Sequence, residues 1–111
     1  MDWIAQTGAV VMFIPHYWNK TLIQEAVGQT QGLLIQGGST PLTYQNGSMT
    51  EHQLAVEWAL ESAKRINKYR EYPVWMTCLG YQSLVLDVTK DPNSLQQKQF
   101  ENLNILLKVK I

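Results

Sequence analysis

The sequence predicts an α/β fold built on a partial, doubly wound parallel sheet. Short apolar runs alternate along the chain with helical segments, and each run ends in turn-forming residues. The predicted order is helix, strand, helix, strand, helix, strand and helix, with one further strand near the end. This order specifies parallel strands joined by right-handed crossovers, with helices on both faces of the sheet.

Length and charge exclude several classes of function. A chain of 111 residues forms one domain at most, and its nine basic and nine acidic residues cancel. Nothing therefore suggests a nucleic acid or a charged membrane as partner. The longest apolar run, residues 9–14, is too short to cross a bilayer, and the N-terminus lacks a signal-peptide pattern. One cysteine excludes an internal disulfide and a multi-cysteine metal site, and we expect no metal and no cofactor.

Turn and cap residues divide the first half of the chain. Gly8 stops a helix, Pro15 ends an apolar strand, and Thr21 has the form of a capping-box residue. The expected elements are a helix at residues 2–6, a strand at 9–14, a helix at 21–27 and a strand at 32–35.

The second half is predicted to begin with the longest helix. Thr50 and Gln53 form a capping box, and apolar residues recur at helical spacing up to about Tyr69. On its solvated face, Glu61 is placed to pair with Arg65. The expected elements are this helix, a strand at residues 74–76, a helix at 82–88 and a strand at 103–109.

The only cysteine lies between a strand and a helix. The apolar run at residues 74–76 leads into Cys78, and Gly80 opens the next helical segment. This order predicts a nucleophile elbow, in which the helix dipole and free N–H groups favour the thiolate. The N–H of Leu79 would then face an oxyanion formed on the attacked carbonyl. The alternative interpretation is an inert, buried cysteine.

A second strand, residues 32–35, runs into Gly37 and Gly38. Paired glycines allow positive φ and a close backbone approach to a ligand, although a plain loop is the alternative. If both strands lie in one parallel sheet, the glycine turn and Cys78 emerge at the same carboxyl-terminal edge, where ligands bind.

Residues 32–39 and 72–82 together resemble the γ-glutamyl hydrolases, members of the class I glutamine amidotransferase-like superfamily. Those proteins carry a strand ending in Pro-Gly-Gly-Ser and, after a helix, a Pro-Val-Trp-Gly-Thr-Cys-Leu-Gly-Phe-(Glu or Gln) elbow. Residues 3–11 also resemble the family's helix-to-strand passage. Two departures stand out, since Met76 replaces the family's glycine and Gln36 its proline. The resemblance implies a flavodoxin-like, three-layer fold, and we expect Met76 to crowd the pocket or the sheet below it.

The resemblance also implies a hydrolase acting on a small molecule, such as a folate or antifolate polyglutamate. In this family Cys78 would be the nucleophile and would form a thioester with the γ-glutamyl group. The N–H groups of Leu79 and Gly38 would hold the oxyanion, while Gly37, Gly38 and Gln82 would contact the substrate.

The family's general base is a histidine that follows the elbow, and no histidine follows Cys78 here. His16 and His52 precede it, and we interpret them as surface or packing residues. Residues 1–111 are therefore expected to form one incomplete domain, without the family's first strand and C-terminal half. Such a fragment would have little activity alone and an unpaired sheet edge open to self-association.

Two other functions stay open: a non-catalytic remnant or binding module, and a glutamine amidotransferase that releases ammonia. The aromatic residues around the elbow favour the hydrolase. The resemblance implies a lysosomal, vacuolar or extracellular location, whereas the chain expressed as given would stay in the cytoplasm.

Overall fold

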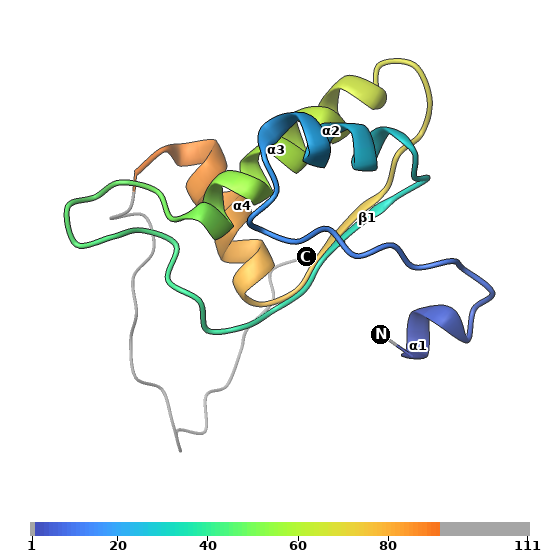
Figure 1. The fold of residues 1–111 in the computed structure, drawn as a ribbon, viewed down its shortest axis with the longest axis horizontal. Helices are drawn as coiled ribbons and strands as arrows, with labels where there is room; N and C mark the ends of the chain where they lie inside the picture. Colours follow the sequence, from blue (N-terminus) through green and yellow to red (C-terminus); the bar gives the residue numbers. More distant parts are fainter. Residues whose placement is uncertain (1, 92–111) are drawn as a thin grey trace, which may run out of the picture.

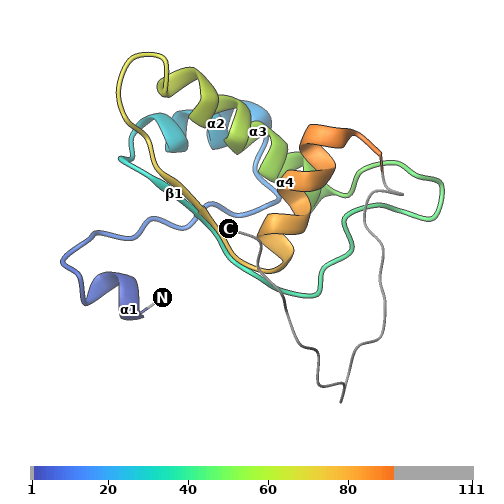
Figure 2. The same ribbon diagram turned by 180° about the vertical axis from the view of Figure 1, so that it is seen from behind.

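A computed structural model describes residues 2–91 and shows an α/β arrangement. In Figures 1 and 2, three helices lie to one side of two paired strands, and α1 lies to the other side. The predicted strand at residues 103–109 falls outside the described residues. The elements are α1 (Asp2–Ala5), α2 (Lys20–Gly28), β1 (Leu33–Ile35), α3 (Glu51–Ile66), β2 (Val74–Met76) and α4 (Leu79–Thr89).

The two strands form a parallel sheet in which Leu34 pairs with Trp75. Hydrogen bonds extend this ladder at both ends, from the Leu33 N–H to Pro73 O (3.0 Å) and from the Thr77 N–H to Ile35 O (3.1 Å). The α/β class and both strands were correctly predicted. The doubly wound sheet stays a prediction, because the sheet of the described residues has two strands.

Helix α3 joins the strands and packs on the sheet. Its predicted N-cap is confirmed, since the Gln53 N–H donates to the Thr50 hydroxyl (3.3 Å). The helix ends at Ile66 and not near Tyr69. Asn67 explains the early end, because its side chain donates to Tyr72 O (3.0 Å) and accepts from the Tyr72 N–H (2.9 Å). This exchange turns the chain towards β2.

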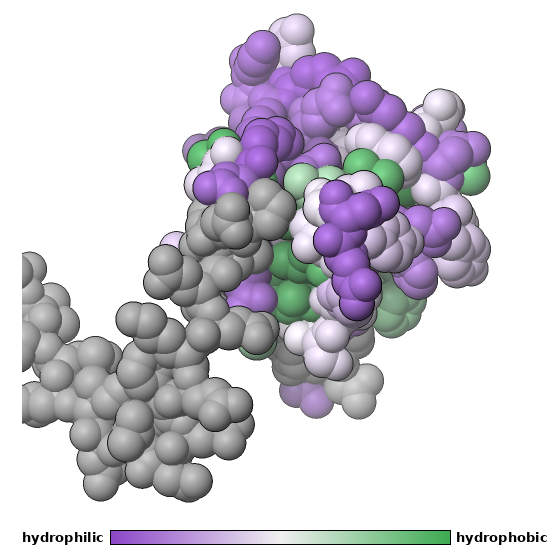
Figure 3. Space-filling model, turned by 90° about the vertical axis from the view of Figure 1, so that its left-hand side faces the viewer, coloured by the Kyte–Doolittle hydropathy of each residue, from purple (hydrophilic) through white to green (hydrophobic). Residues whose placement is uncertain are grey.

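Three clusters of buried apolar residues form the core, and α3 contributes to the first two. Half-buried Leu33 and Val74 contact both of these clusters and so tie the sheet to α3. On the face seen in Figure 3, hydrophilic residues surround a small apolar area. The first cluster is Ile23, Val27, Ala55, Ala59, Ala63 and Tyr72; the second is Ile35, Val56 and Leu60; the third is Leu42, Leu79 and Leu86.

The predicted strand at residues 9–14 is wrong. This segment belongs to neither a helix nor a strand; Val10 is 98% exposed, whereas Ile14 packs against the first cluster. An apolar run becomes a strand only where a partner edge is available, and that partner is set by the tertiary fold.

Two local predictions also need correction. The cap of α2 is Asn19 and not Thr21, because the Asn19 side chain accepts a hydrogen bond from the Leu22 N–H (2.9 Å). Glu61 pairs with Lys20 of α2 (3.2 Å) and not with Arg65. Within residues 2–91, no helix has the length and apolar character needed to span a bilayer.

Candidate active site

Cys78 occupies the turn between β2 and α4. Its backbone is strained, with φ of 54° and ψ of −110°, in a region that residues other than glycine rarely adopt. Such strain costs about 1–3 kcal/mol and persists only where the surroundings enforce it. The side chain is exposed and makes no capping hydrogen bond to α4. The predicted elbow is therefore present, and the alternative of a buried cysteine is wrong.

The glycine turn after β1 lies directly against this cysteine. A Cβ atom added at Gly37 would stand 3.0 Å from the Cys78 Cβ and 3.7 Å from its Sγ. Gly38 has more room, since a Cβ there would first meet a Leu79 methyl group at 3.7 Å. Neither glycine has a positive φ, so the turn does not use the positive φ that paired glycines allow. Close approach to Cys78 is the reason for glycine at residue 37.

Gly80 fixes the elbow from the other side. A Cβ atom at this position would stand 2.6 Å from Ile35 O and 2.9 Å from the Ile35 Cγ2. Helix α4 can therefore begin this close to β1 only because residue 80 has no side chain. The sequence predicts a glycine-containing elbow here, but it does not show the close contact with Ile35 that requires glycine at residue 80.

The backbone donors expected at the site belong to residues around the elbow, since Leu79 follows Cys78 and Gly38 follows Gly37, which lies against Cys78. Leu79 is the first residue of α4, so its N–H has no partner within the helix. In the part of the chain that the structure describes, no hydrogen bond uses the N–H of Gly37, Gly38 or Leu79. Gln82 follows one turn into α4, and its side chain is exposed. The residues predicted for the site are thus brought to one edge of the sheet.

Met76 belongs to the core below the elbow. Its half-buried side chain packs against the second cluster, on the face of the sheet that α3 covers. Trp75, the next residue back along β2, is 66% exposed. Met76 is therefore a core contact, and whether it crowds the sheet stays a prediction.

A buried glutamine holds α3 against α4. Gln53 was predicted to complete a capping box, but its side chain is fully buried and donates to Ser83 O (3.0 Å). A helical pattern alone could not reveal this contact, because Ser83 lies thirty residues away in the sequence.

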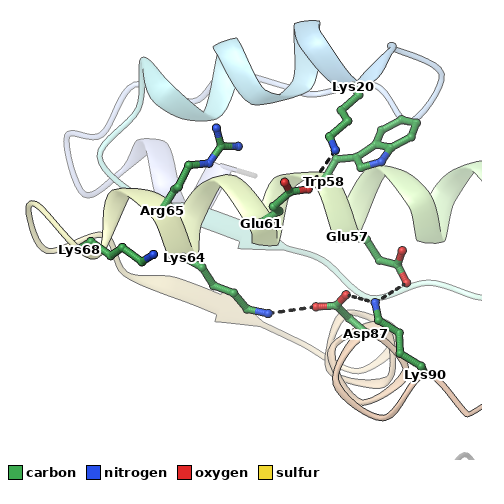
Figure 4. Close-up of a pocket in the computed structure, with 9 residues that line it drawn as sticks. All are labelled: Lys20, Glu57, Trp58, Glu61, Lys64, Arg65, Lys68, Asp87 and Lys90. Atoms are coloured by element: carbon green, nitrogen blue, oxygen red, sulfur yellow. Dashed lines mark hydrogen bonds and ion pairs between the residues drawn. The ribbon is translucent and has the colours of Figure 1, made fainter.

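Ion pairs reinforce the same helix contact within a charged groove of about 540 Å³ (Figure 4). The Asp87 side chain is only 9% exposed; it accepts a hydrogen bond from Lys90 (2.8 Å) and forms an ion pair with Lys64 (3.5 Å). The Lys90 ammonium also reaches Glu57 (3.5 Å). The hydrogen bond to Asp87 is the main reason why the pKa of Lys90 is raised. Glu57 and Asp87 thus link α3 to α4 and its C-cap, whereas Glu61 of the same groove pairs with Lys20 of α2.

The histidines lie elsewhere. His16 and His52 line a cavity of about 260 Å³, and Cys78 does not contribute to its wall. Burial is the main cause of a lowered pKa at His52, followed by the positive charge of His16. Among residues 2–91, no group of three His, Cys, Asp or Glu side chains is arranged to hold a metal ion.

An exposed cysteine at a strand-to-helix elbow, beside a glycine turn of the neighbouring strand, defines a class of α/β proteins with a cysteine nucleophile. The chain belongs to the Peptidase C26 family, whose family model matches residues 1–97. This family places the chain among the class I glutamine amidotransferase-like peptidases and implies hydrolase activity. No curated protein and no solved structure matches the chain significantly.

Proposed function

We propose that this chain provides the nucleophile and oxyanion site of a γ-glutamyl hydrolase, with Cys78 as the nucleophile. The strained, exposed thiol at the start of α4, packed against Gly37, is the observation that supports the proposal most strongly. The elbow's aromatic residues, Trp75 and Tyr81, resemble the γ-glutamyl hydrolase motif, and this resemblance supports a γ-glutamyl peptide as substrate over free glutamine.

The proposed reaction has two stages. The Cys78 thiolate attacks the γ-carbonyl carbon, and the negative charge moves to the carbonyl oxygen, where the N–H groups of Leu79 and Gly38 would stabilise it. Each such donor contributes about 3–4 kcal/mol to transition-state stabilisation. Collapse of this intermediate breaks the C–N bond, and the leaving amine takes up a proton. Water then hydrolyses the thioester, which restores the thiol and releases the γ-carboxylate.

A general base is the part of this chemistry that the described residues do not bring to the thiol. His16 and His52 line a cavity that does not include Cys78. Loss of one triad member lowers the rate by several powers of ten, although binding and the oxyanion hole retain some catalysis. We therefore expect the 111-residue chain to hydrolyse a γ-linked polyglutamate at or near the background rate.

Covalent labelling tests the nucleophile without requiring turnover. A glutamate derivative with a chloromethyl ketone in place of its γ-amide should alkylate Cys78, and mass spectrometry would locate the adduct. We expect this label to react at least ten-fold faster than a simple chloromethyl ketone without the amino and carboxylate groups. Equal rates for the two reagents would contradict glutamyl recognition, and Cys78→Ala controls for labelling at other residues.

Steady-state assays separate the remaining alternatives. Robust cleavage of γ-linked polyglutamate that disappears in Cys78→Ala would show that the base is supplied after all. Release of ammonia from glutamine, without cleavage of the peptide, would instead favour the amidotransferase. A chain that is neither labelled nor active would be a non-catalytic remnant or a binding module.

A further inference from the structure

The cavity that contains both histidines lies beside the glycine turn. Its wall begins at Thr40 and Pro41, which follow Gly38 after a single residue. Three Cα–Cα steps separate Gly37 from Thr40, so the two residues are at most about 11 Å apart. Since Gly37 touches Cys78, this distance corresponds to about three residues of an extended peptide. A peptide that extends about three residues from the one held at Cys78 is therefore long enough to reach the cavity.

Backbone and side-chain hydrogen bonds hold the cavity wall in place. The Thr50 hydroxyl donates to Pro41 O (2.8 Å), and the Thr50 N–H donates to Leu42 O (3.0 Å). Further along the loop, the Tyr44 N–H donates to Ser48 O (2.8 Å). The loop is thus tied to the start of α3, which makes the cavity a preformed feature.

Apart from the Thr50 hydroxyl, the imidazoles and hydroxyl groups in this wall make no side-chain hydrogen bond to the described residues. Across residues 2–91, no hydrogen bond involves the side chains of His16, Thr40, Tyr44 or His52. Two imidazoles and two hydroxyl groups can all donate to a carboxylate, whereas Glu51 is the one acid in the wall. A volume of about 260 Å³ lies just below the range of drug-sized pockets and suits a group the size of one amino acid.

We propose that this cavity, lined by His16, Tyr44 and His52, binds a carboxylate of a glutamyl residue beyond the one that Cys78 attacks. The inference rests on the proposed function, because it assumes a γ-linked substrate extending from the thiol. It adds a second contact point, up to about three residues from the thiol, on the polyglutamate chain that the proposed function assumes.

The sequence makes the test direct. The chain contains only two histidines, and both line this cavity, so their imidazole proton signals report on this site alone. Titration with tri-γ-glutamate at constant pH should shift both signals to saturation. The same peptide with its carboxylates converted to amides should bind at least five-fold more weakly. Unmoved signals, or equal affinity for the two peptides, would overturn the proposal without any mutation.

Variants add a directional test. Tyr44→Phe should weaken binding of tri-γ-glutamate at least three-fold, whereas Glu51→Gln should tighten it by removing a like charge. Tyr69→Phe is the matched control, because Tyr69 is 87% exposed and lies outside the cavity. An unchanged or weaker affinity in Glu51→Gln would contradict the proposal, with circular dichroism confirming that each variant is folded.

The two proposals can fail separately. If Cys78 is labelled selectively while the histidine signals do not respond, the carboxylate site is wrong and the nucleophile assignment stands. If the histidines respond and Cys78 is not labelled, the cavity binds carboxylates and the proposed hydrolase chemistry is wrong.

Discussion

Replacement of Gly80 by alanine tests how the elbow is built. The new Cβ would stand 2.6 Å from the backbone oxygen of Ile35 and 2.9 Å from its Cγ2 atom. The first of these atoms belongs to the sheet and cannot rotate away. Helix α4 and β1 must therefore move apart, which strains the turn that holds Cys78.

The expected loss of stability follows from three terms. Overpacking of a well-packed core costs about 1–3 kcal/mol. Ile35 O also accepts the hydrogen bond from Thr77, and its weakening costs about 1 kcal/mol. Alanine regains about 1 kcal/mol through its higher helix propensity. We therefore expect Gly80→Ala to lower the free energy of unfolding by about 1–3 kcal/mol, or Tm by roughly 5–20 °C.

Urea unfolding monitored by circular dichroism measures this change. Gly28→Ala is the matched control, since Gly28 is also helical but has no atom within 4 Å of an added Cβ. This control should be neutral or stabilising by up to about 1 kcal/mol. If Gly80→Ala proves as stable as Gly28→Ala, the close approach of α4 to β1 does not constrain the elbow.

Three further predictions concern the site and its support. Gly37→Ala should slow the labelling of Cys78, because the added Cβ would lie 3.0 Å from the cysteine Cβ. Gly38→Ala is the control, and mass spectrometry should show the same labelling rate of Cys78 as in the unchanged chain. Met76→Gly should lower the free energy of unfolding by about 1–3 kcal/mol in urea, because it removes a side chain packed against the second cluster; unchanged stability would show that methionine crowds the sheet. The lowered pKa of His52 means that the unfolded state binds its proton first. Unfolding free energy should therefore fall as the pH drops through the ordinary histidine value of 6.5 and level off below the lowered pKa, and His52→Gln should flatten this profile.

The sequence alone determined the elements whose signals are local. Thr50 marked the start of α3, and two short apolar runs gave β1 and β2. The order of strand, Cys78 and helix predicted the elbow. Each of these signals depends on residues within a few positions of one another, so it can be read without knowing how the rest of the chain folds.

Tertiary structure decided the features that depend on distant partners. Residues 9–14 have the composition of a strand, but no sheet edge pairs with them in the described structure. Glu61 could pair along its own helix, yet Lys20 lies closer once α2 packs on α3. The sequence position of Gln53 suits a capping box, but in the structure its side chain donates to the buried Ser83 O of α4. Burial and pairing are set by which elements meet, and a local pattern carries no information about that meeting.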